Sequence, residues 1–246
     1  MKIMVINPNT SKQMTEHLEH VLMAIKGPDT ELTVTCPDEG PDAIESAMDE
    51  AACTIPVLKL IEKANKEGYD ACILACFSDP GLEPAREISN ILVTGIEEIS
   101  MHMAAMLGAK FSVMTLNQER VPSKETHVRR FKMEGALASV RPIGLSVAES
   151  DANPELAKKR IMEAAKKAAE EDGAEVIILG CAGMAGYAED VERELGIVVI
   201  DPSSVALKIT EGMVAAGLKP SKRGLYAIPP RIKRAGGADL EEVGIK

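Results

Sequence analysis

The chain has 246 residues, of which 46% are apolar, and a formal net charge of −10. This length can bury a sizeable core in one large or two small domains, and the negative charge argues against a nucleic-acid partner. No apolar run approaches a membrane span, and the first residues do not resemble a signal peptide. We therefore expect a cytoplasmic protein with no membrane partner, whose five dispersed cysteines stay reduced.

Short β-rich runs alternate with helical stretches along the chain. The first half predicts strands at 2–6, 31–36, 70–76 and 91–95, and helices at 15–25, 48–64, 80–88 and 97–107. The second half predicts strands at 108–115, 139–145, 173–181 and 197–201, a helix at 154–171, a helix after Cys181 that runs toward Leu195, and a last helix that ends at Gly217. Strands that alternate with helices predict parallel βαβ units with helices on both faces of a sheet.

The two halves repeat one another. GYDACILAC, 68–76, matches GAEVIILGC, 173–181, at an offset of 105 residues, and later matches follow at offsets up to 109. We therefore predict an α/β fold of two similar parallel-sheet lobes, related by pseudo-two-fold symmetry, with the active site in the cleft between them. The predicted first lobe is 1–95 with about 208–246, and the second is 96–207. The basic tail from Leu218 is expected to pack on the first lobe or on a neighbouring subunit.

Two cysteines occupy equivalent places in this repeat. Cys76 and Cys181 each end a buried strand, and open parallel sheets bind ligands beyond the carboxyl ends of their strands. The expected helix after Cys76 would take Asp79 as its cap and Pro80 in its first turn, which would lower the pKa of a nearby thiol. The other three cysteines are expected in the core. No spacing of cysteine and histidine indicates a metal site.

Six short motifs carry a family resemblance: VINPNTS (5–11), GPDAIES (40–46), ACFSDPGL (75–82), GIEE (95–98), FSVMT (111–115) and LGCAGM (179–184). The chain resembles the Asp/Glu racemase superfamily, and within it the hydantoin and allantoin racemase branch. The resemblance implies racemisation without a cofactor, in which one cysteine thiolate removes a proton and the opposite thiol returns one. Those residues would be Cys76 and Cys181. A thiol's pKa suits it to act as acid or base near neutral pH.

The substrate site is expected in the turns that follow equivalent strands. Its predicted residues are Asn7, Thr10, Phe77, Ser78, Asp79, Gly95, Ile96, Thr115, Ala182, Gly183 and Met184. Amino-acid racemases of the superfamily typically carry Asn-Thr and Thr-His after the two cysteines, where this chain has Phe77-Ser78 and Ala182-Gly183. Since no Arg or Lys flanks either cysteine, a 5-monosubstituted hydantoin fits better than an amino acid.

Other functions remain open from the sequence. Within the superfamily, the alternatives are an allantoin racemase, an aspartate or glutamate racemase, or a maleate-type isomerase that uses the same cleft. Outside it, the alternative is a small-molecule-binding protein, since ligand receptors also place a cleft between two α/β lobes. In each case we expect a small-molecule partner, no bound metal or cofactor, and a homo-oligomer.

Overall fold

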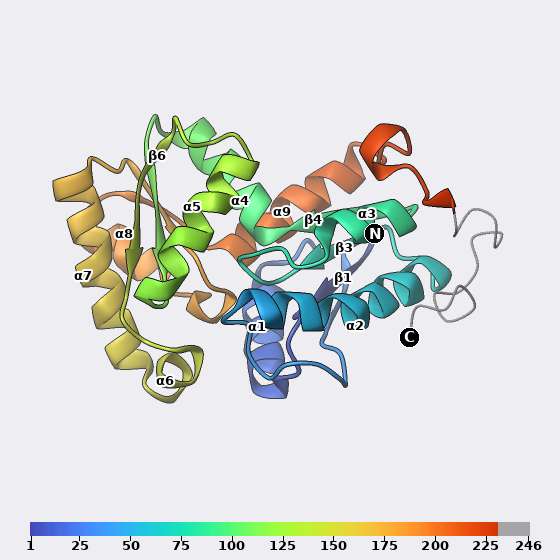
Figure 1. Ribbon diagram of the computed structural model, residues 1–246, viewed down its shortest axis with the longest axis horizontal. Helices are drawn as coiled ribbons and strands as arrows, with labels where there is room; N and C mark the ends of the chain where they lie inside the picture. The colour runs from blue at the N-terminus through green and yellow to red at the C-terminus, as the bar shows by residue number, and fades with distance from the viewer. Residues whose placement is uncertain (231–246) are drawn as a thin grey trace. The chain divides into compact units, whose positions relative to one another are not determined.

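The computed structural model describes residues 1–230 (Figure 1). The chain divides into two compact units: residues 1–95 with the described residues from Leu207 onward form unit 1, and Ile96–Ala206 form unit 2. No helix among the described residues is both long and apolar enough to cross a membrane.

Unit 1 is built on a four-stranded parallel sheet. Its strands are β1 (Lys2–Ile6), β2 (Glu31–Thr35), β3 (Ala71–Leu74) and β4 (Leu92–Gly95). They pair in the order β2-β1-β3-β4, with Ile6 opposite Leu74 and Leu74 opposite Gly95. All four residues of β3 are buried, as expected for a strand covered on both faces. This sheet confirms the predicted class for the first half.

Three helices pack on this sheet, and the end of a fourth completes the unit. They are α1 (Lys12–Ile25), α2 (Ala47–Lys66), α3 (Leu82–Ile88) and α9 (Pro202–Ala215). Ser11 caps α1, so the helix begins three residues before the predicted start at Thr15. Leu18 and Leu22 of α1 are 1% exposed, and Ile61 of α2 is fully buried.

Unit 2 repeats the same sheet. Its strands are β5 (Phe111–Thr115), β6 (Leu137–Pro142), β7 (Val176–Leu179) and β8 (Val198–Ile200), in the order β6-β5-β7-β8. All are parallel, and Met114 lies opposite Leu179 as Ile6 lies opposite Leu74 in unit 1. The two halves therefore share one topology, which confirms the two similar lobes expected from the repeat.

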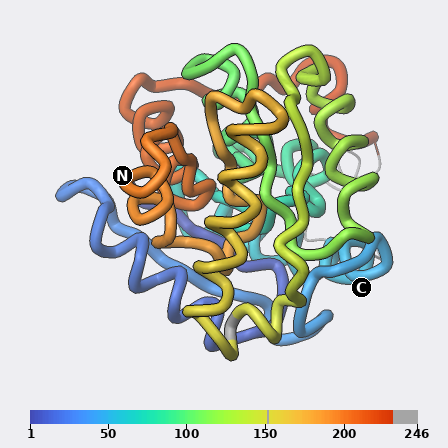
Figure 2. Tube along the Cα trace, turned by 90° about the vertical axis from the view of Figure 1, so that its left-hand side faces the viewer, coloured from blue at the N-terminus to red at the C-terminus, as the bar shows by residue number. Residues whose placement is uncertain are grey.

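The helices of unit 2 include two that the sequence did not predict. They are α4 (Ile96–Leu107), α5 (Val121–Arg130), α6 (Val147–Ala152), α7 (Pro154–Asp172) and α8 (Ala188–Leu195). Helix α7 packs on β5 and β6, and Figure 2 shows it running along the strands on the side that faces the viewer. The helices missed from the sequence are α5 and α6, since neither carries a long apolar stripe. Short 3₁₀ turns lie at Gln118–Arg120, Ala182–Met184 and Gly224–Tyr226.

Gly108 and Gly217 each follow a helix, where a glycine is expected in the left-handed conformation. Gly217 has the left-handed φ of 68° expected beyond a helix, but Gly108, which follows α4, is not left-handed. A methyl group at Gly108 would lie 2.9 Å from the side chain of Val176 and 3.0 Å from that of Glu175. Glycine is needed at position 108 for close packing against β7.

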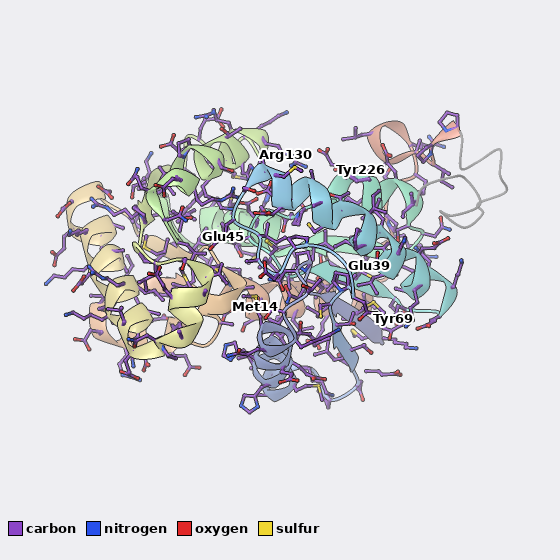
Figure 3. All side chains as sticks on the ribbon, turned by 60° about the horizontal axis from the view of Figure 1, so that its bottom comes forward. Met14, Glu39, Glu45, Tyr69, Arg130 and Tyr226 are labelled. Atoms are coloured by element: carbon purple, nitrogen blue, oxygen red, sulfur yellow. The ribbon has the colours of Figure 1, made fainter. Side chains whose placement is uncertain are left out.

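The described part of the C-terminal tail lies on unit 1. Lys222 Nζ donates to the carbonyl oxygens of Arg86, Glu87 and Ser89, at 2.7, 2.8 and 2.8 Å, and so caps the end of α3. Tyr226, labelled in Figure 3, stacks under the Arg86 guanidinium at 5.4 Å. The segment beyond residue 230 lies outside the described residues.

Candidate active site

In each unit, the sheet order defines where a ligand site is expected. The order reverses between β1 and β3 in unit 1, and between β5 and β7 in unit 2. Crevices in open parallel sheets lie at such reversals, beyond the strands' carboxyl ends. Matching hydrogen bonds extend both pairings: Ala75 N–H donates to the Ile6 carbonyl, and Gly180 N–H donates to the Met114 carbonyl, each at 2.8 Å. One residue further along the chain stand Cys76 and Cys181.

The turn after β1 is a rigid hydrogen-bonded unit. The Asn7 side chain is 1% exposed, and its Nδ2 donates to Asn9 Oδ1 at 2.7 Å and to Thr15 Oγ1 at 3.1 Å. Ser11 Oγ accepts from the N–H of Met14, which lies in the first turn of α1 and is labelled in Figure 3. Thr10 donates its N–H to the Pro41 carbonyl at 3.0 Å and so joins the VINPNTS and GPDAIES motifs. Ser11 is thus a helix cap, and Thr10 ties two loops.

This network gives a prediction for Asn7→Ala. Removing the amide takes a donor from Asn9 Oδ1 and Thr15 Oγ1, so we expect the free energy of unfolding to fall by about 1–3 kcal/mol. Urea unfolding measures that loss. Steady-state kinetics well below the melting temperature test the predicted substrate contact. A large fall in kcat/KM with unchanged stability would contradict the structural role and favour direct contact.

The Cys76 turn presents its thiol beside a hydroxyl. Cys76 is half-buried, whereas Phe77, Ser78 and Asp79 are 3%, 5% and 2% exposed. The Cys76 carbonyl accepts the N–H groups of Ser78 and Asp79, at 2.8 and 3.0 Å, which closes a tight turn. Cys76 Sγ lies 3.4 Å from Ser78 Oγ, within hydrogen-bond range for sulfur. The predicted site residues after β3 therefore form one compact turn.

The predicted helix cap at Asp79 was wrong. Helix α3 begins at Leu82, its N-cap is Gly81, and no side chain caps it. Asp79 has a φ of 45°, and its carboxyl atoms would lie 2.1–2.3 Å from a methyl group at Gly95. The carboxyl group therefore rests on the bare Cα of Gly95, and α3 begins two residues after its predicted start at Pro80.

The Cys181 turn differs from its counterpart. Cys181 is half-buried and precedes the 3₁₀ turn Ala182–Met184, whose Met184 N–H donates back to the Cys181 carbonyl at 3.0 Å. The N–H groups of Ala182 and Gly183 donate to no acceptor among the described residues. Two backbone donors beside a thiol can hold a developing negative charge on an oxygen.

Two further predicted site residues, Thr115 and Ile96, lie at the carboxyl ends of strands. Thr115 ends β5 and is 2% exposed, and fully buried Ile96 begins α4. Next to Ile96, Glu97 bonds Lys124 Nζ at 3.1 Å and His127 Nδ1 at 2.7 Å. Burial opposes the ionisation of Glu97, but these two partners outweigh it and lower the pKa of Glu97 below its ordinary value. This cluster, which the sequence did not predict, fastens the first turn of α4 to α5.

The five cysteines differ enough in burial to predict their reactivity. Cys36, Cys53 and Cys72 are 5%, 0% and 0% exposed, and burial raises the pKa of both Cys53 and Cys72 to about 12. Such a thiol is ionised only to roughly one part in 10⁵ at pH 7. We expect iodoacetamide to label Cys76 and Cys181 at least about tenfold faster than the other three, as read by peptide mass spectrometry.

The control for this labelling is the denatured protein, in which all five thiols should react alike. Labelling of Cys72 as fast as Cys76 in the folded protein would contradict the assignment.

Among the described residues, no group of three or more His, Cys, Asp or Glu side chains could hold a metal ion.

Comparison with known proteins shows extensive similarity. The family model described as Asp/Glu/Hydantoin racemase matches residues 3–210. A hydantoin racemase of Pseudomonas sp. (strain NS671) is 39% identical over 244 residues, which span 99% of this chain and 97% of the relative. That of Paenarthrobacter aurescens is 36% identical over 234 residues, 93% of this chain and 98% of the relative. The structure of allantoin racemase from Klebsiella pneumoniae is 37% identical, with a TM-score of 0.90 over 94% of both chains.

Proposed function

Because the chain belongs to the Asp/Glu/Hydantoin racemase family and is thus an isomerase, we propose that it inverts one carbon of a 5-monosubstituted hydantoin. The proton transfers are assigned to Cys76 and Cys181. The observation that supports this most is that the two cysteines are equivalent. Cys76 follows β3 and Cys181 follows β7, and these strands hold the same place in two sheets of the same strand order. They are also the two cysteines that are not buried.

The proposed reaction needs no external acid, base or oxidant. The thiolate of one cysteine takes the proton from the ring carbon, and the C–H electron pair moves into the adjacent carbonyl to form an enolate. The thiol of the other cysteine gives its proton to the opposite face of that carbon. The first cysteine ends as thiol and the second as thiolate, and the opposite enantiomer reverses these roles.

The enolate oxygen needs hydrogen-bond donors. The N–H groups of Ala182 and Gly183 are the best candidates, since no protein acceptor among the described residues takes them. In the Cys76 turn the N–H groups of Ser78 and Asp79 are already bonded to the Cys76 carbonyl. The turn around Cys181 would therefore stabilise the charge, with the Ser78 hydroxyl as a further donor from the other turn.

The ring system fits the neutral character of these turns. Neither cysteine has a flanking Arg or Lys that could pair with the carboxylate of an amino acid. The relatives' names give two substrates, hydantoins and allantoin, and allantoin is itself a hydantoin with a ureido group on the carbon that inverts. The open choice is therefore the substituent, and allantoin is the second candidate.

Solvent-exchange experiments test this proposal. Each enantiomer of several 5-substituted hydantoins, of allantoin and of aspartate is incubated with the protein in D₂O. Polarimetry follows inversion, and proton NMR follows loss of the C–H signal. We expect inversion and deuterium uptake with a hydantoin. Activity on aspartate alone would overturn the ureide assignment, and no exchange with any of these compounds would overturn the racemase proposal.

A further inference from the structure

Asp201 is a buried carboxylate with an unusual set of partners. It follows β8 directly and is 7% exposed. Its Oδ1 accepts the N–H groups of Ser203 and Ser204, at 3.0 and 3.1 Å, in the first turn of α9. Its Oδ2 accepts the N–H of Gly186 at 2.8 Å. One oxygen thus caps a helix, and the other reaches into the segment that begins at Cys181.

Hydrogen bonds to neighbouring strand ends hold both ends of this segment, from Gly180 to Gly186. At its start, Gly180 N–H donates to the Met114 carbonyl at 2.8 Å. At its end, Gly186 turns the chain with a φ of 89° and donates to Asp201. Between them, Met184 and Ala185 donate back to the carbonyls of Cys181 and Ala182, at 3.0 and 3.1 Å. The internal bonds set the shape of the segment, and the two ends set its orientation.

Unit 1 also has a carboxylate where its cysteine turn meets the end of the neighbouring strand, but there the carboxylate comes from the turn. Thr94 lies opposite Ile73 as Ile200 lies opposite Ile178, so Gly95 is the counterpart of Asp201. There the carboxylate belongs to the cysteine turn, where Asp79 rests on the bare Cα of Gly95. In each unit, therefore, one aspartate joins the cysteine turn to the end of the neighbouring strand. In unit 2 this aspartate follows the strand, and in unit 1 it belongs to the turn.

From this geometry we infer that Asp201 is a positioning residue for the Cys181 turn. Its Oδ2 holds Gly186, and through it the thiol of Cys181 and the N–H groups of Ala182 and Gly183, in the orientation that the reaction requires. The inference rests on the proposed function for its catalytic consequence, but the anchoring itself does not. Misplacing reacting groups by about 1 Å can cost roughly 10²-fold in rate.

Two substitutions separate this role from helix capping. Asp201→Asn keeps an oxygen for the first turn of α9, where Asn caps as well as Asp, but turns an N–H₂ group toward the N–H of Gly186. Asp201→Ser also keeps a cap and is too short to reach Gly186. As the control for a lost cap in the same unit, Asn153→Ala removes the acceptor of the Leu156 N–H at the start of α7.

The measurements are the iodoacetamide labelling rates of Cys181 and Cys76, the melting temperature, and kcat and KM for the preferred hydantoin. In Asp201→Asn or Asp201→Ser we expect the labelling rate of Cys181 to change at least threefold while that of Cys76 does not. We also expect kcat to fall about 10- to 100-fold, with a smaller change in KM. Asn153→Ala should lower the melting temperature and leave both labelling rates unchanged.

The outcomes distinguish this inference from the proposed function. Wild-type labelling of Cys181 in whichever of the two variants folds, with wild-type kcat, would overturn the positioning role and leave Asp201 as a cap only. A changed labelling rate in a protein that racemises no hydantoin would support the anchor and overturn the proposed function.

Discussion

We expect Cys76→Ser and Cys181→Ser each to lose racemisation by about 10²- to 10⁴-fold, the range that a positioned acid or base contributes. A serine hydroxyl holds its proton far more tightly than a thiol, so the substituted side can neither remove the substrate proton nor return one at a useful rate. On the two-base proposal, the remaining cysteine would still face one enantiomer. In Cys181→Ser, Cys76 can therefore remove a proton from that enantiomer, exchange it with solvent and return it to the same face.

The measurement is deuterium uptake against optical rotation, for each enantiomer separately. Each variant should exchange the ring proton of one enantiomer without inverting it, and the two variants should choose opposite enantiomers. Cys36→Ser and Cys72→Ser are matched controls, because both thiols are buried, and they should racemise like the wild type. Normal racemisation by either Cys76→Ser or Cys181→Ser would end the two-base proposal.

The repeat made the strands predictable, but not where they stop pairing. Strand β1 was predicted to the residue, whereas the run 70–76 looked like one strand and forms β3 only over Ala71–Leu74. Ala75 and Cys76 are as compatible with a strand as the residues before them. The chain leaves the sheet because the N–H groups of Ser78 and Asp79 donate back to the Cys76 carbonyl. The sequence of that turn has no apolar periodicity from which its start could be predicted.

Helix α5 shows why the cluster around Glu97 was missed from the sequence. Its buried residues are Lys124 and Val128, so its inner face carries a charge where an apolar stripe would be expected. Lys124 can be buried because Glu97 pairs with it from 27 positions earlier in the chain. No local pattern contains that partner. The same is true of Asp201, whose bond to Gly186 depends on the fold.

Gly180→Ala should be the most disruptive single-methyl change near the site. The added methyl group would lie 2.2 Å from the carbonyl oxygen of Met114 and 2.8 Å from the Val113 side chain. That oxygen cannot move aside alone, because it accepts the Gly180 N–H at 2.8 Å and belongs to a strand paired with β7. Relief requires the ends of β5 and β7 to separate. Overpacking of this kind costs about 1–3 kcal/mol of stability and sometimes more.

The same separation would displace Cys181, the next residue. We therefore expect Gly180→Ala to lower both the melting temperature and kcat, the latter by up to about 100-fold. Gly212→Ala is the matched control, since Gly212 lies exposed in α9 with no atom within 4 Å of an added methyl group. It should be neutral or raise stability by about 0.5–1 kcal/mol. A Gly180→Ala protein that melts and racemises like the wild type would mean that β5 and β7 can part without moving the thiol, and the anchoring of Cys181 through Gly180 would have to be abandoned.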